Sequence, residues 1–253
     1  MPKAFDSSRR KSARAKDHID KFDREVAAFM KTVSYESFSE PDAKNPILTV
    51  HKVRMNGTIP EGVSELAGDA IGNLREALDH AAYAVAIAGG CADPKAAYFP
   101  FSGTSERFES SMRGRCKDIP EEMYPVFRSF EPWSEGNDVL YTLNQLAIRN
   151  KHTLLIPFGA MAQDAGMDVG GTGYMSMPDP HFWNHAKNEM ELITLGPDTK
   201  FKAHFRFFTT IAFSGINIIQ YQPATAVLLE ISREVQRVVA AIEDESRRLG
   251  YIS

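Results

Sequence analysis

The chain has 253 residues, 43% of them hydrophobic, which is enough for a substantial core and typical of a globular protein. Its formal net charge of -4 argues against a general nucleic-acid binder held by bulk positive charge. No apolar run approaches the roughly 18 residues that span a bilayer, and Cys91 and Cys116 form no CxxC or zinc-type pattern. We therefore expect one cytoplasmic domain, residues 1–253, with reduced thiols and no membrane partner.

Apolar residues at alternating spacings of three and four predict long amphipathic helices. In the second of them, Leu74, Ala77 and Leu78 fall within one arc that should face a core. Shorter helices are expected at residues 105–115 and from Pro120 onwards. The four predicted long helices span approximately residues 9–31, 62–88, 138–152 and 223–248.

Runs rich in β-branched and aromatic residues predict strands, so the fold class is α+β: a bundle of long helices packed with an antiparallel sheet. Residues 159–180 contain five glycines and predict a long, irregular and mobile loop. The predicted strands are residues 32–39, 47–54, 153–160, 191–195 and 202–214, of which the first two and the last two should form hairpins.

The first predicted helix begins with a cluster of cations. No aromatic residues are interleaved with them, so we interpret the cluster as a solvated helix start, with phosphate contact as the alternative. The cluster consists of Arg9, Arg10, Lys11, Arg14 and Lys16.

A row of polar residues follows the helix predicted at 62–88, on the side away from the apolar arc. Glu76 and His80 are one turn apart, so they could ligate a metal ion or act as an acid and base pair. The alternative is structural, because a half-buried histidine bonded to a neighbouring helix is common. We name this row, with the adjacent acid, as a candidate site: Asp69, Asn73, Glu76, Asp79 and His80.

A second polar group ends the helix predicted at 138–152. Arg149 and His152 share a face, so a guanidinium could hold a phosphate while the imidazole transfers a proton. The helix dipole also favours basic residues at a C-terminus, which is the structural alternative. Facing helices of a bundle often build a site between them, so His80 would then lie near Arg149 and His152.

The segments GDAIGNLREALDH, YFPFS and EPW…LAIRNKHTLL resemble a widespread bacterial family of uncharacterised proteins. Members carry a similar helix with asparagine, leucine, arginine and an aspartate–histidine pair, and a later lysine–histidine at the end of a second helix. The resemblance covers roughly residues 19–156. It implies the architecture and singles out His80 and His152, without a reaction.

Arg149, Asn150 and His152 also resemble, more distantly, HEPN-type helical domains, whose ribonuclease members use an arginine and a histidine near a helix end. This resemblance implies a metal-independent ribonuclease or related phosphodiester enzyme acting on RNA or a nucleotide. Arg149 would bind phosphate, and His152 would be the general acid or base, with His80 beside them. The supporting residues would be Asp69, Asn73, Glu76, Asp79, Asn150 and Lys151.

The chain has no Gly-rich phosphate loop, GxSxG, HExxH or spaced Cys/His zinc pattern, so no cofactor is expected. Two other functions stay open. The polar row could serve a non-catalytic binding or regulatory protein, or Glu76, His80 and His152 could serve a metal-dependent hydrolase or oxygenase. The long helices predicted at 9–31 and 223–248 could pair in a homo-oligomer.

Overall fold

The computed structural model describes residues 4–149, 155–161, 166–171, 173–178, 183–184, 187–204, 207–219 and 222–253. The fold is α+β, as predicted. The chain divides into two compact units, the first comprising residues 1–23, 61–154 and 213–253 and the second comprising residues 24–60 and 155–212.

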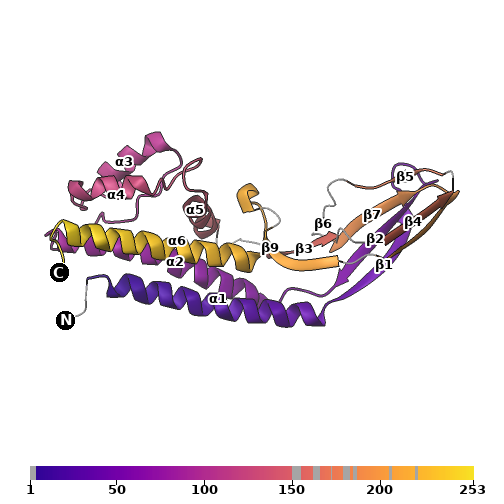
Figure 1. Ribbon diagram of the computed structural model, residues 1–253, viewed down its shortest axis with the longest axis horizontal. Helices are drawn as coiled ribbons and strands as arrows, with labels where there is room; N and C mark the ends of the chain where they lie inside the picture. Colours follow the sequence, from indigo (N-terminus) through magenta and orange to yellow (C-terminus); the bar gives the residue numbers. More distant parts are fainter. Residues whose placement is uncertain are drawn as a thin grey trace. The chain divides into compact units, whose positions relative to one another are not determined.

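Helices make up the first unit, and the four predicted long helices are confirmed. The first begins three residues earlier than predicted, and the predicted last turn at 150–152 lies outside the described residues. The helices are α1 (Asp6–Thr32, of which residues 24–32 belong to the second unit), α2 (Glu61–Ala88), α3 (Ser105–Arg115), η1 (Glu121–Met123), α4 (Tyr124–Ser129), α5 (Asp138–Arg149), η2 (Asn217–Ile219) and α6 (Ala224–Arg248), with η marking 3-10 helices (Figure 1).

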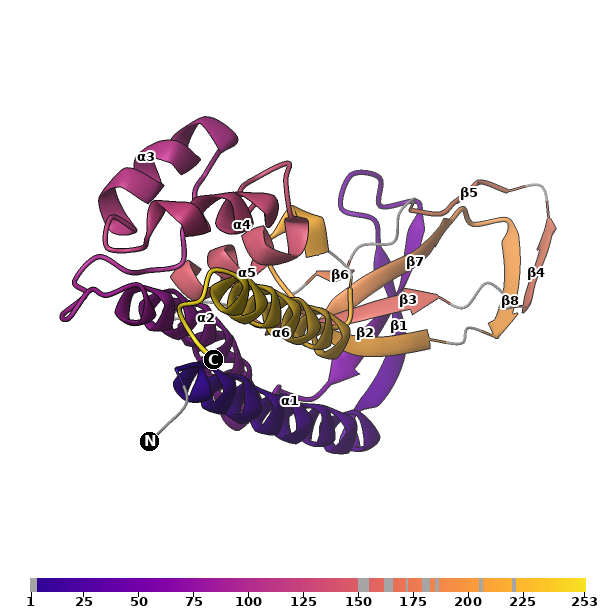
Figure 2. The same cartoon turned by 60° about the vertical axis from the view of Figure 1, so that its left-hand side comes forward.

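Helices α2 and α6 pack side by side at the centre of the first unit. The beginning of α1 lies on one side of this pair, and α3, α4 and α5 lie on the other (Figures 1 and 2). Among the helices that the structure describes, none has the length and apolar character to cross a membrane. Helix α2 therefore separates α1 from α5, an arrangement that decides which residues can share a site.

The apolar arc predicted on α2 is buried: Leu74, Ala77 and Leu78 are inaccessible to solvent. Two phenylalanines of the YFPF turn extend this core. Phe99 and Phe101 are both buried, and the Phe99 ring packs edge-on against another buried ring, that of Phe127. The turn thus closes the end of the helical core, while its first residue is left at the surface.

Strands make up the second unit. Three sheets are formed: a five-stranded sheet of order β1-β2-β7-β5, in which β6 also pairs with β7, and the two-stranded sheets β3-β9 and β4-β8. The strands are β1 (Ser34–Pro41), β2 (Thr49–Asn56), β3 (Leu155–Met161), β4 (Gly166–Gly171), β5 (Met175–Ser176), β6 (Trp183–Asn184), β7 (Glu189–Leu195), β8 (Thr199–His204) and β9 (Phe207–Phe213).

The first predicted hairpin is confirmed, since β1 and β2 pair antiparallel from Ser34 opposite Asn56 to Pro41 opposite Thr49. The second predicted hairpin is wrong. Strand β7 pairs with β2 on one side and with β5 and β6 on the other, and β5 occupies Thr194 and Leu195, the end of β7 where a hairpin with the following strand would begin. Strand β8 instead pairs with β4, and β9 pairs with β3.

The loop predicted at 159–180 is also partly wrong, because residues 166–171 form β4 and residues 175–176 form β5. Glycine suits this place for a steric reason. Gly171 has a φ of +108°, and a Cβ there would come within 2.3 Å of the Asp198 carbonyl oxygen. The glycines allow close approach of two backbones, which glycine content alone does not distinguish from an irregular loop.

Candidate functional site

The polar row of α2 faces helix α1. Ser7, Lys11 and His18 are spaced by four and then seven residues, so they lie along one stripe of α1. Their partners on α2 step back by the same intervals, which is the register of two antiparallel helices. The pairs are Ser7 Oγ with His80 Nδ1 (a 2.6 Å hydrogen bond), Lys11 with Glu76 (an ion pair), and His18 Nδ1 with Asp69 Oδ2 (3.8 Å apart).

A buried hydrogen bond strengthens the same contact. Ser8 Oγ donates to the carbonyl oxygen of Ala77 at 2.7 Å, and Ser8 is inaccessible to solvent. The predicted Asn73 has a local role, since its Nδ2 donates to the Asp69 carbonyl oxygen one turn earlier at 2.8 Å. Part of the predicted row is therefore used to hold α1 against α2.

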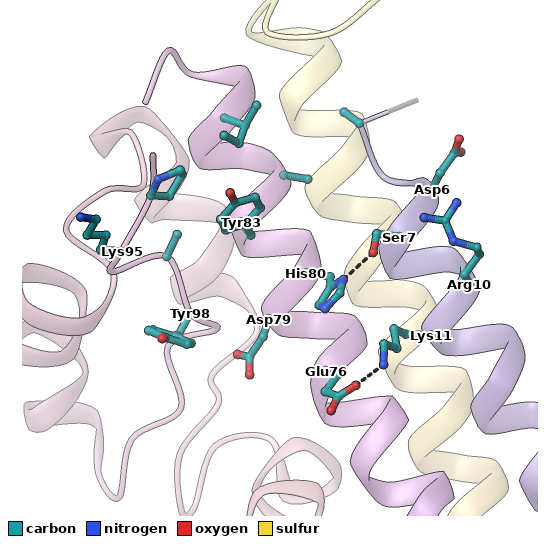
Figure 3. A pocket seen from close by; sticks show the side chains of 15 residues that line it. Asp6, Ser7, Arg10, Lys11, Glu76, Asp79, His80, Tyr83, Lys95 and Tyr98 are labelled. Atoms are coloured by element: carbon teal, nitrogen blue, oxygen red, sulfur yellow. Dashed lines mark hydrogen bonds and ion pairs between the residues drawn. The ribbon is translucent and has the colours of Figure 1, made fainter. Parts of the chain in front are cut away.

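Beyond these contacts, a cavity of about 940 Å³ opens between the start of α1, the second half of α2 and the segment 94–98. Figure 3 shows Arg10 and Lys11 extending from α1, His80 from α2, and Tyr98 from the following segment. This volume lies within the range of small-molecule sites, roughly 300–1,000 Å³. The predicted Glu76, Asp79 and His80 all line the cavity.

Asp79 occupies a different face of α2 from His80. Successive helical residues are rotated by about 100°, so Asp79 turns toward the YFPF turn, where its Oδ1 accepts a 2.9 Å hydrogen bond from the Phe99 backbone N–H. Arg75 approaches it from one turn earlier, with Nε 3.7 Å from Oδ2. The Arg75 guanidinium also stacks over the Phe101 ring at 4.0 Å and donates to Asn144 Oδ1 of α5.

Burial shifts both members of this pair toward neutrality. It raises the pKa of Asp79, against the opposing effects of the Arg75 charge and the Phe99 hydrogen bond. Burial likewise lowers the pKa of Arg75, although Asp79 acts in the opposite direction. The loss of solvation thus outweighs the attraction between the two charges, as expected at a separation too long for a hydrogen bond.

The cations around the cavity differ in how far they are neutralised. Lys11 is paired with Glu76, and Lys95 lies 3.4 Å from Asp93. Arg10 is exposed and forms no ion pair within the described part of the chain. It is the cavity cation that is most available to a ligand.

The second predicted group contributes only one described residue. Arg149 is exposed at the end of α5 and its Nη1 donates to the Gly215 carbonyl oxygen, while Asn150, Lys151 and His152 lie outside the described residues. Arg149 does not line the cavity that contains His80. His80 contacts α1, whereas Arg149 is carried by α5, which packs on the opposite side of α2 (Figures 1 and 2).

Within the described ranges, no three or more histidine, cysteine, aspartate or glutamate side chains are grouped so as to hold a metal ion. Glu76 and His80 point instead to Lys11 and Ser7.

Comparison with models of protein families, with curated proteins and with solved structures found no match.

The cavity also includes residues that the sequence interpretation missed. Ser7 was not singled out, Tyr98 was noted only as part of the YFPFS segment, and Arg10 and Lys11 were interpreted as a solvated helix start. One signal was available: the spacing of Ser7, Lys11 and His18 on the first helix mirrors the spacing of the polar row on the second.

Proposed function

We propose that the protein binds a nucleotide in the cavity between α1 and α2. The observation that carries this proposal is the composition of the cavity wall, which has at one end an arginine that forms no ion pair with the described residues and has tyrosines at the other end. A nucleotide has the matching division into a charged phosphate and an aromatic base. The chain would then be a binding or regulatory protein that uses the polar side of α2.

The phosphate would lie at the α1 end. Arg10 presents a planar guanidinium that can bind two phosphate oxygens, and it forms no ion pair with a carboxylate of the described residues. Lys11 and Ser7 lie within the same wall. Arg14, one turn further along α1, extends the positive surface beside the cavity.

The base would lie at the other end, against the segment 94–98. Tyr98 is 47% exposed even though its neighbour Phe99 is buried, so its ring is presented to the cavity rather than to the core. Tyr83 and Ile87 of α2 add apolar surface to the same wall. Stacking of a base on an aromatic side chain contributes roughly 1–3 kcal/mol.

Isothermal titration of the purified protein with GMP, AMP, UMP and inorganic phosphate tests the proposal. At least one mononucleotide should bind more tightly than phosphate, and Arg10→Ala and Tyr98→Ala should each weaken it about tenfold or more. Lys16→Ala is the matched control, because Lys16 is on α1 but pairs with Asp20 outside the cavity. Absence of binding, or binding indifferent to Arg10→Ala, would overturn the proposal.

A metal-independent ribonuclease of HEPN type is a second candidate function. One observation favours it: the Arg149 guanidinium is exposed, and its partner is a neutral carbonyl, so its charge is not neutralised by a described carboxylate. Such an arginine could bind an RNA phosphate beside His152. In this arrangement His80, Glu76 and Asp79 would belong to the separate cavity.

Cleavage of a labelled single-stranded RNA in the presence of EDTA tests this second candidate. His152→Ala and Arg149→Ala should abolish cleavage while leaving the thermal melt nearly unchanged. His80→Ala should retain cleavage, because His80 faces α1. Equal cleavage by His152→Ala and the unmodified protein would exclude this function.

A further inference from the structure

Asp79 offers the cavity an unused hydrogen-bond acceptor. Its Oδ1 already accepts the Phe99 N–H, whereas its Oδ2 is 3.7 Å from Arg75 Nε and accepts no hydrogen bond from the described residues. Figure 3 shows the carboxylate on the side of α2 turned away from α1, toward the segment that carries Tyr98 and Phe99. An acceptor therefore lies where the proposed function puts the base.

We propose that Asp79 selects the ligand by accepting hydrogen bonds from the edge of its base, and that the ligand is a guanine nucleotide. This inference rests on the proposed nucleotide-binding function and adds the identity of the base. Asp79 would then determine which base is bound, a role separate from its ion pair with Arg75.

The chemistry of the bases favours guanine. An ionised carboxylate only accepts hydrogen bonds, and it binds best to two donors side by side. Guanine presents such an edge, with N1–H next to the exocyclic 2-amino group. Adenine places an acceptor beside its amino group, and uracil places its N3–H between two carbonyl oxygens, so each sets an acceptor against the carboxylate.

The surroundings of Asp79 would make this contact strong. Most of its side chain is removed from water, which is the cause of its raised pKa. In such a site a hydrogen bond is worth more than at the surface, and an unmatched carboxylate oxygen is more costly. A guanine edge would supply donors that Arg75 does not provide to Oδ2.

Titration calorimetry with GMP, IMP, AMP and XMP tests the inference. The unmodified protein should bind GMP about tenfold or more tightly than IMP, which lacks the 2-amino group, and than AMP. Asp79→Asn should weaken GMP binding by about tenfold or more and strengthen XMP binding. Xanthine carries a carbonyl at position 2, which an asparagine amide can donate to.

The controls separate specificity from folding. Asparagine keeps an oxygen for the Phe99 N–H, and a thermal melt verifies that Asp79→Asn is folded. Asp23→Asn, an exposed acid of α1 outside this cavity and outside the adjoining basic surface, should leave all four affinities unchanged. If Asp79→Asn does not fold, the affinities of the unmodified protein for GMP, IMP and AMP still test whether the site selects guanine.

The possible outcomes distinguish the two proposals. If no mononucleotide binds, nucleotide binding and the guanine assignment both fail. If GMP, IMP and AMP bind equally, or if Asp79→Asn lowers GMP and XMP affinity alike, binding stands and the guanine assignment is overturned. A loss of GMP affinity together with a gain of XMP affinity supports the assignment, because a purely structural role of Asp79 would not produce it.

Discussion

Ser7 Oγ and His80 Nδ1 lie 2.6 Å apart and join the first turn of α1 to the second half of α2. Because of this bond, the polar row on α2 forms a contact surface for α1 rather than a fully solvated face. It also fixes the antiparallel register of the two helices, since Lys11 and Glu76 pair one turn further along. The cavity depends on this register, because α1 supplies one of its walls.

A double-mutant cycle on Ser7→Ala and His80→Ala should show a coupling free energy of about 1 kcal/mol, the usual net contribution of a hydrogen bond. The measurement is the free energy of unfolding from urea denaturation. Ser110→Ala is the matched control, because Ser110 is an exposed α3 serine that donates to the Arg107 carbonyl oxygen of its own helix. Strictly additive effects of Ser7→Ala and His80→Ala would contradict an energetic role for the bond.

The sequence was sufficient to predict the helices and the first hairpin, because periodicity reports which face of an element is buried. The arc containing Leu74, Ala77 and Leu78 identified the core side of α2 correctly. Periodicity does not report which element covers a face. Contact between the polar row and the helix carrying Arg149 was therefore a reasonable expectation, and the observed partner, α1, follows only from how the helices pack.

Strand pairing was less predictable for a related reason. The residues of β7 and β8 are close in sequence and have strand composition, which favours a hairpin locally. The observed pairing of β7 with β2 brings together residues far apart in the chain, among them Arg54 and Glu189, whose side chains form an ion pair. Long-range pairing of this kind depends on the whole sheet, so no short window contains it.

Phe99→Ala should lower the free energy of unfolding by roughly 3–5 kcal/mol, since it removes a fully buried ring that packs against three other phenylalanines. Tyr98→Ala, at the adjacent position, should change it by roughly 0.5 kcal/mol or less, because Tyr98 is 47% exposed. Chemical denaturation of both variants measures the difference. Similar losses for the two would show that Tyr98 is a core residue and not a cavity residue.

The two cysteines should differ sharply in reactivity. Burial raises the pKa of the Cys116 thiol to about 12, and its Sγ–H donates to the Tyr98 carbonyl oxygen at 3.1 Å. Cys91 is only half-buried. Because the thiolate is the reactive form, a thiol reagent such as DTNB should modify one cysteine quickly at neutral pH and the second only at the rate of unfolding. Cys91→Ser identifies the fast thiol, and rapid labelling that survives this substitution would contradict the assignment.

Asp79 should make the stability of the protein fall as pH rises through the range above its ordinary pKa. Its folded-state pKa is raised from 3.8, chiefly by burial. Between the ordinary pKa and the raised folded-state pKa, the folded state holds a proton that the unfolded state has lost. The free energy of unfolding therefore decreases as pH rises through this range, by at most about 1.4 kcal/mol per pH unit for one proton. Above the raised value the decrease ends.

Urea denaturation of the unmodified protein and of Asp79→Asn across this range measures the effect as a difference between two curves. The unmodified protein should lose stability relative to the variant as pH rises. Asp118→Asn provides a control of opposite sign. Backbone hydrogen bonds from Ala96 and Lys95 lower the pKa of Asp118, so its contribution to stability is present above the ordinary pKa and is lost as pH falls. Parallel curves for the unmodified protein and Asp79→Asn would show that Asp79 titrates alike in the folded and unfolded states.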